Sequence, residues 1–146
     1  MHLSCCIWAL TGPEDENLRQ MAELGFGWID IQPAMLATPE TCSAAARLGL
    51  RVSSLGASFD LPPGASLDSP DASARAAALA HVERACAHAA NVGASAVYVI
   101  PGLDSSQPAL THYANSMAAA AAQAQGHGLK LCIEHFPGRA LDTAAA

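Results

Sequence analysis

The chain has 146 residues, which is enough for one domain with a sizeable core. Its residues are 51% hydrophobic and only 14% charged, a composition that excludes a disordered chain. The net charge is −6 and no cluster of Lys and Arg is present, so we expect no nucleic-acid partner held by its phosphates.

Five apolar runs along the chain are typical of buried strands. They cover residues 3–9, 28–32, 51–55, 96–100 and 130–134. The segments between them carry apolar residues at helical spacing, with Leu18 and Met21 in the first as an example. The pattern predicts strands that alternate with helices.

The expected helices begin at residues that favour a first turn. Pro13 and the acids after it open the first helix, and Thr38-Pro39-Glu40 opens the second in the same way. Asp71 is placed to cap the third, and the fourth starts near Pro108. Asp142 could cap a fifth helix that has barely begun at the last residue.

A glycine follows each of the first four helices, at Gly25, Gly49, Gly93 and Gly128. Glycine just past a helix end adopts the left-handed conformation without a Cβ clash. The repeated order of helix, glycine and strand predicts right-handed βαβ units, and therefore an α/β fold with five parallel strands in one sheet.

Such a sheet can be open, as in flavodoxin-like or Rossmann-like folds, or part of a barrel. Open sheets that bind nucleotides usually carry a glycine-rich turn after the first strand. Here Gly12 is followed by Pro13 and acids, so a nucleotide site is weakly supported. The longest irregular stretch, residues 57–70, is either a functional loop or a disordered excursion.

The five cysteines are odd in number and form no CxxC pair, which favours buried reduced thiols over disulfides or a zinc site. The first ten residues lack the basic leader of a secretory signal. No apolar run approaches the ~18 residues of a membrane span. We therefore expect a cytoplasmic protein with no membrane partner.

The last apolar run ends in an acid, Glu134. In parallel α/β folds the carboxyl ends of the strands carry the chemistry, because the loops there converge. If Glu134 points into a barrel, Cys132 and Lys130 share its face, whereas His135 turns outward or into the loop. The alternative is a solvated acid at a strand end.

Three phrases of the sequence resemble the sugar phosphate isomerase/epimerase family, which has the xylose isomerase-like (β/α)8 barrel. They are GFGWIDI at 25–31, VGASAVYV at 92–99 and LCIE at 131–134. Because a full barrel takes roughly 250 residues, the resemblance implies that 1–146 is one partial domain, the amino-terminal half of a TIM barrel with about four and a half βα units.

The resemblance also implies a divalent metal ion (Mn, Mg, Co or Zn) and gives Glu134 two roles, as a metal ligand and as a catalytic group in proton transfer. The family's other ligands come from strands six, seven and eight, before which this chain stops. Three further residues are candidates for substrate binding. Trp8 could form a flat wall for a sugar ring or belong to the core, Asp30 could face the substrate or make a structural hydrogen bond, and His135 could contact the substrate or be solvated.

By this resemblance the function is a metal-dependent sugar or sugar-phosphate isomerase or epimerase that acts through an enediolate. The isolated half is expected to be inactive. Its two open sheet edges predict self-association or pairing with a second half-barrel. The alternatives are a non-catalytic domain that binds a partner or metabolite, and a phosphodiesterase like endonuclease IV, for which the chain has no basic groove.

Overall fold

The computed structural model describes residues 2–142, in which five parallel strands form one sheet in the order β1-β2-β3-β4-β5. The strands are β1 (Cys5–Cys6), β2 (Trp28–Ile31), β3 (Arg51–Gly56), β4 (Ala96–Val99) and β5 (Lys130–Ile133). The helices between them are α1 (Glu14–Glu23), α2 (Pro39–Arg47), α3 (Ala72–Asn91) and α4 (Gln107–Gly126).

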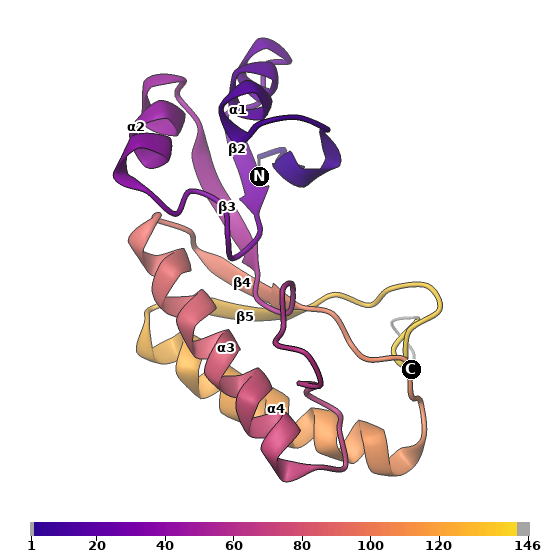
Figure 1. Cartoon of the computed structure of the whole chain (residues 1–146). Coiled ribbons are helices and arrows are strands. Elements are labelled where there is room, and N and C mark those ends of the chain that lie inside the picture. The colour runs from indigo at the N-terminus through magenta and orange to yellow at the C-terminus, as the bar shows by residue number, and fades with distance from the viewer. Residues whose placement is uncertain (1, 143–146) are drawn as a thin grey trace.

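The strand order separates a barrel from a doubly wound sheet. Every strand pairs in parallel with the strand that follows it in the chain. Since βαβ crossovers are right-handed, an order without reversal leaves all helices on one face of the sheet, as in a barrel. A doubly wound sheet reverses its order. Figure 1 shows α3 and α4 side by side along one face of β4 and β5. The predicted α/β half-barrel is confirmed.

The helices begin and end where their local sequence predicts. Thr38 and Thr41 form a capping box at the start of α2, and the Asp71 side chain accepts a hydrogen bond from the Ser73 N–H at the start of α3. Each of the four helices is followed by a glycine with a positive φ angle between 73 and 85°, as at Gly93. The fifth helix predicted after Asp142 lies outside the described residues.

Of the predicted first strand, residues 3–9, only Cys5–Cys6 form a strand. Residues Ile7–Ala9 form a short 3-10 helix, η1, which the Leu10 N–H closes by donating to the Ile7 carbonyl oxygen. As an edge strand, β1 has only β2 as a partner. The apolar run after it is buried through Ile7, whose side chain lies in the core. Trp8 therefore lies on η1 and does not close a strand.

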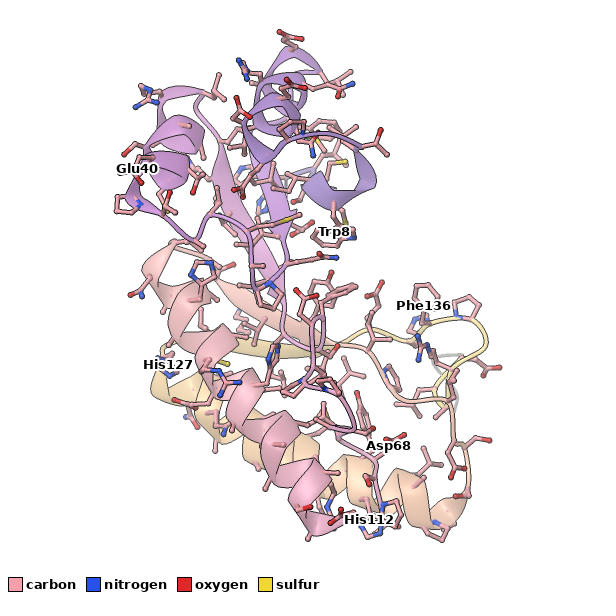
Figure 2. The ribbon with its side chains drawn as sticks, viewed as in Figure 1. Trp8, Glu40, Asp68, His112, His127 and Phe136 are labelled. Carbon is pink, nitrogen blue, oxygen red and sulfur yellow. The ribbon has the colours of Figure 1, made fainter. Side chains whose placement is uncertain are left out.

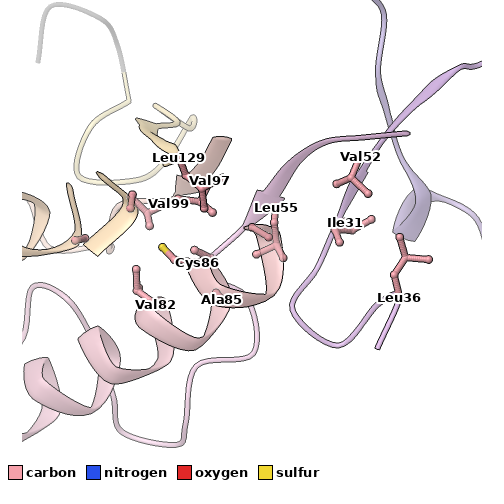
Figure 3. Close-up of a cluster of buried hydrophobic side chains, with 14 of the residues drawn as sticks. Ile31, Leu36, Val52, Leu55, Val82, Ala85, Cys86, Val97, Val99 and Leu129 are labelled. Carbon is pink, nitrogen blue, oxygen red and sulfur yellow. The ribbon is translucent and has the colours of Figure 1, made fainter. Parts of the chain in front are cut away.

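The core lies between the sheet and its helices. Side chains of Val97 and Val99 on β4 meet Val82 and Cys86 of α3 in Figure 3, and all four are fully buried. Burial of each such valine stabilises the fold by about 1.5–3 kcal/mol. Burial, with a smaller effect of Glu83, also raises the pKa of the Cys86 thiol to about 11.

The loop between β3 and α3 is held by hydrogen bonds to α3, to α4 and to the residue that follows β4. The His81 Nε2 of α3 lies 2.8 Å from the Phe59 carbonyl oxygen, and the Ile100 N–H after β4 donates to the Ser58 Oγ at 2.9 Å. The Ser116 hydroxyl of α4 donates to the Leu67 carbonyl oxygen at 2.6 Å. The stretch is therefore an ordered loop and not a disordered excursion, whereas a function of this loop stays a prediction.

The five cysteines are free thiols, but only Cys86 is buried and Cys132 is exposed. The expectation of buried thiols thus holds for Cys86 alone. Within 2–142, no helix combines the length and the apolar character needed to cross a membrane.

Candidate active site

Alternation along the strands gives the sheet one apolar face and one polar face. Ile29 and Ile31 of β2 are fully buried toward the helices, whereas Asp30 between them points to the opposite face. On β4, Val97 and Val99 are buried in the same way, and Tyr98 points to the same side as Asp30. In a closed barrel this second face would line the interior.

An open hollow of about 330 Å³ lies on this second face, and we call it the polar hollow. Six of the residues that line it have side chains that can hydrogen-bond or ionise. The lining residues are Cys6, Asp30, Ser54, Ala96, Tyr98, Cys132, Ile133 and Glu134. The structure therefore brings Glu134 and Asp30, two residues chosen from the sequence, into one site.

Glu134 comes directly after β5 and keeps strand-like pairing, because its N–H donates to the Val99 carbonyl oxygen at 3.0 Å. Its side chain shares the polar hollow with Cys132, as alternation predicts. Lys130, predicted to share this face, is not among the residues of the hollow. Glu134 is exposed, since no strand covers this edge in the described part of the chain.

Asp30 accepts a hydrogen bond from the Ser54 hydroxyl, with 2.6 Å between Oγ and Oδ1. The structural alternative predicted for Asp30, a bond to a neighbouring strand, is thus present. The register of β2 and β3 shifts between Ile29 and Asp30, and such a bulge re-aims the side chains beside it. A carboxylate accepts several hydrogen bonds, so Asp30 keeps capacity for a ligand.

Negative charge gathers in the polar hollow. Burial raises the pKa of the Cys6 thiol to about 11, with further increases from Asp30, Cys5 and Glu134. Burial also raises the pKa of Tyr98, with contributions from Cys6, Glu134 and Asp30. The sequence reading missed Tyr98 as a site residue, although its position one residue from Val97 and Val99 would have placed it on the polar face.

An aromatic row joins Trp8 to the polar hollow. The Trp8 ring centroid lies 5.4 Å from that of Phe59, and the Phe59 ring meets Tyr98 edge-on at 6.3 Å. Figure 2 shows Trp8 and Phe136 on the same side of the molecule, each projecting from the ribbon. Trp8 is half-buried, which leaves part of its ring available for contact.

His135 is exposed in the loop that follows β5 and does not line the polar hollow. This loop folds back through the Phe136 N–H, which donates to the Leu141 carbonyl oxygen at 3.0 Å. The Ala140 N–H donates to the Gly102 carbonyl oxygen at 2.9 Å and ties the loop to the end of β4. Substrate contact by His135 stays a prediction.

The resemblance implies a divalent metal ion, and the structure shows which side chains could bind it. Across residues 2–142, no group of three or more His, Cys, Asp or Glu side chains is placed to hold a metal ion. Catalytic zinc sites, for comparison, use three protein ligands. These residues therefore do not form a metal site on their own, and Glu134 could contribute only one ligand.

Three solved structures of similar fold are informative. The chain superposes on L-ribulose 3-epimerase with a TM-score of 0.74 at 20% identity, covering 90% of this chain and 48% of that one. For D-allulose 3-epimerase from Methylomonas sp. the TM-score is 0.80 at 17% identity, with 95% and 53% covered. A xylose isomerase-like TIM barrel protein from Mycobacterium smegmatis, in complex with magnesium, gives 0.71 at 19% identity, with 97% and 57% covered.

The chain thus spans about half the length of the structures it resembles. No curated protein matches its sequence. Residues 18–145, most of the chain, match the family model described as xylose isomerase-like TIM barrel. The chain belongs to the xylose isomerase-like TIM barrel family.

Proposed function

We propose that this chain is the amino-terminal half of a sugar or sugar-phosphate isomerase or epimerase, with Glu134 as the group that moves the proton. The observation that carries the proposal is the position of Glu134, directly after β5 and lining the polar hollow. Active sites of TIM barrels lie at this end of the strands. Two of the similar structures are sugar 3-epimerases, which supports a sugar as the substrate.

The proposed reaction begins when the Glu134 carboxylate takes the proton from the carbon next to the sugar carbonyl. The electron pair of that C–H bond forms the carbon–carbon double bond of an enediolate, and the carbonyl oxygen gains the negative charge. Delivery of a proton to the opposite face by a second acid, from the other half of the barrel, gives an epimer, and return of the proton from Glu134 to the neighbouring carbon gives an isomer. A positioned general base of this kind contributes about 10²–10⁴-fold to the rate.

The remaining sequence candidates would bind the sugar around this centre. Asp30 can accept hydrogen bonds from sugar hydroxyls with the oxygen atoms that Ser54 leaves free. The partly exposed Trp8 ring would pack against the apolar face of the sugar. His135, in the loop beyond Glu134, would reach the sugar from the rim.

We further propose that the complete barrel binds a divalent metal ion, with Glu134 as one ligand and the others from the second half. The magnesium in the Mycobacterium smegmatis structure supports this proposal. Glu134→Gln should lower the metal content of the purified intact gene product, measured by mass spectrometry of the eluted metal. An unchanged metal content would remove the metal assignment.

The function is tested by conversion of D-fructose, D-tagatose or D-allulose by the intact gene product, with the sugars separated by chromatography. We expect conversion by the wild type and a loss of at least about 100-fold in Glu134→Gln, because the base is removed. Glu23→Gln is the matched control: Glu23 is an exposed acid at the end of α1, away from the polar hollow, and its loss should change nothing.

Equal conversion by wild type and Glu134→Gln would contradict the role of Glu134. Sugar binding without any conversion would favour the non-catalytic alternative, and cleavage of damaged DNA would favour the phosphodiesterase. The net charge of −6 disfavours the phosphodiesterase, because a DNA substrate needs a basic surface. The free thiols suit the reducing cytoplasm, where we propose that the protein acts.

A further inference from the structure

We propose that the Tyr98 hydroxyl is the hydrogen-bond donor that holds the carbonyl oxygen of the substrate while Glu134 takes the neighbouring proton. This role rests on the proposed function and adds a residue to it. Neither the sequence motifs nor the family match assigns anything to Tyr98.

The strand register places Tyr98 in the middle of the sheet. Its Cα pairs with Gly56 on β3 and with Cys132 on β5, two residues before Glu134. Side chains two residues apart on a strand share a face, so Tyr98, Cys132 and Glu134 point the same way. Tyr98 accordingly lines the polar hollow together with Glu134.

The Tyr98 side chain packs beside Gly56 and Phe59. Gly56 leaves room for it, since a Cβ atom at Gly56 would come 3.0 Å from the Tyr98 oxygen and 2.4 Å from the Phe59 ring. Phe59 meets the Tyr98 ring edge-on, and its own carbonyl oxygen is held by His81. A donor held in this way loses little entropy when a ligand oxygen binds to it.

The polar hollow needs a donor, and Tyr98 supplies it. A sugar carbonyl only accepts hydrogen bonds, and the ionised carboxylates of Asp30 and Glu134 also only accept. The Ser54 hydroxyl already donates to Asp30, and the thiols of the hollow are weak donors. The Tyr98 hydroxyl, which carries its proton at neutral pH, is the other O–H group of the hollow.

Tyr98 keeps its proton throughout the proposed step. As the C–H proton passes to Glu134, the carbonyl oxygen becomes negatively charged, and the Tyr98 O–H strengthens its hydrogen bond to that oxygen. The hydroxyl donates without transferring its proton. Stabilisation of an oxygen that gains charge in the transition state raises kcat more than it lowers KM.

The chain offers a matched pair of variants, since it has two tyrosines. In the intact gene product, Tyr98→Phe should lower kcat for the converted sugar about 100-fold with little change in KM, as expected for loss of one oxyanion donor. Tyr113→Phe, the same change on α4 outside the polar hollow, should leave kcat and KM unchanged. Tyr98→Phe keeps the ring that packs on Phe59, and an unchanged thermal unfolding temperature would show that it folds.

A second experiment detects binding of the sugar at the Tyr98 hydroxyl in the absence of turnover. With tyrosine labelled with ¹³C at Cζ, the two variants assign one signal each, and saturating D-fructose should shift the Tyr98 signal of the Glu134→Gln protein but not that of Tyr113. Wild-type conversion together with full kcat in Tyr98→Phe, or an unmoved Tyr98 signal, would overturn the role of Tyr98 and leave the proposed function standing. Absence of conversion by the wild type would overturn both.

Discussion

Two carboxylates, Asp30 and Glu134, set the chemistry of the polar hollow. Both contribute to the raised pKa of Cys6 and of Tyr98, although burial is the larger cause in each. The two acids come from strands that are three positions apart in the sheet, so only the curl of the sheet brings them to one hollow. In the proposed function, a sugar bound there would meet acceptors from both strands and one donor from Tyr98.

The influence of Asp30 on Cys6 predicts a change in thiol reactivity. The thiolate is the reactive form, and a pKa of about 11 keeps Cys6 protonated at pH 9. Asp30→Asn removes the larger of the two carboxylate effects, so the pKa of Cys6 should fall and its alkylation by iodoacetamide at pH 9 should become faster. Glu134→Gln should have a smaller effect in the same direction.

Peptide mass spectrometry measures the alkylation of Cys6 separately from Cys5. Cys86, which is buried on the other side of the sheet with Glu83 as its charged neighbour, is the internal control and should not respond. An unchanged alkylation rate of Cys6 in Asp30→Asn would contradict the charge effect.

The close approach of Phe59 to Gly56 predicts a stability effect. In Gly56→Ala the new Cβ would overlap the Phe59 ring at 2.4 Å, and we expect overpacking of this kind to lower the free energy of unfolding by about 1–3 kcal/mol. Gly27→Ala is the control, because a Cβ there meets no atom within 4 Å. Urea denaturation of both variants checks this, and equal midpoints would argue against the packing described for Phe59.

At the scale of elements, the helices could be predicted because their signals are local. Thr38, Asp71 and the glycines that end the helices act within one turn, and the structure places them as expected. The first strand could not be predicted beyond Cys6, because an apolar run does not say whether burial is reached by a strand or, as for Ile7, by a short 3-10 helix. Trp8 was misplaced for the same reason.

The site was only partly predictable from the sequence. Glu134 stood out because it ends an apolar run, and Asp30 because an acid inside a strand is unusual. The tertiary contacts of Tyr98 could not be predicted, since they depend on Gly56 and Phe59, which lie more than 35 residues before it. The hydrogen bond between Asp30 and Ser54 depends on a register shift that leaves no signal in the sequence.

The capping box predicts that the stability of the fold depends on Thr38, the N-cap residue of α2. In Thr38→Ala the Thr41 N–H loses its acceptor, and we expect the free energy of unfolding to fall by about 1 kcal/mol. Thr111→Ala, the same change in the interior of α4, should leave stability equal or slightly higher because alanine favours helix. Thermal or urea unfolding measures both, and a loss in Thr111→Ala as large as in Thr38→Ala would contradict this account.

At the scale of the whole molecule, the described half-barrel leaves the edge of β5 uncovered. Ile133 is 47% exposed there, and it lines an apolar groove of about 380 Å³ between α4 and β5. The other residues of this groove are Leu110, Tyr113, Ala114, Met117 and Leu141. An open parallel edge beside an apolar groove is a surface that a second half-barrel would cover.

We therefore expect residues 1–146, produced alone, to self-associate. Light scattering should give a molar mass above that of the 14.9 kDa monomer, and the mass should fall in Ile133→Lys, because a charge on the edge opposes strand pairing. Leu24→Lys is the control, because Leu24 is an exposed apolar residue at the end of α1 and lies on neither edge of the sheet. A monomer at all concentrations would show that the open sheet is self-sufficient.

The most direct test of proton transfer at Glu134 is the incorporation of solvent deuterium into the sugar. The intact gene product is incubated in D₂O with the sugar that it converts, and the recovered sugar is analysed by NMR. We predict one deuterium on a carbon next to the carbonyl with the wild type and with Glu23→Gln, and none with Glu134→Gln. Conversion by the wild type without deuterium, or deuterium incorporation by Glu134→Gln at the wild-type rate, would contradict the account.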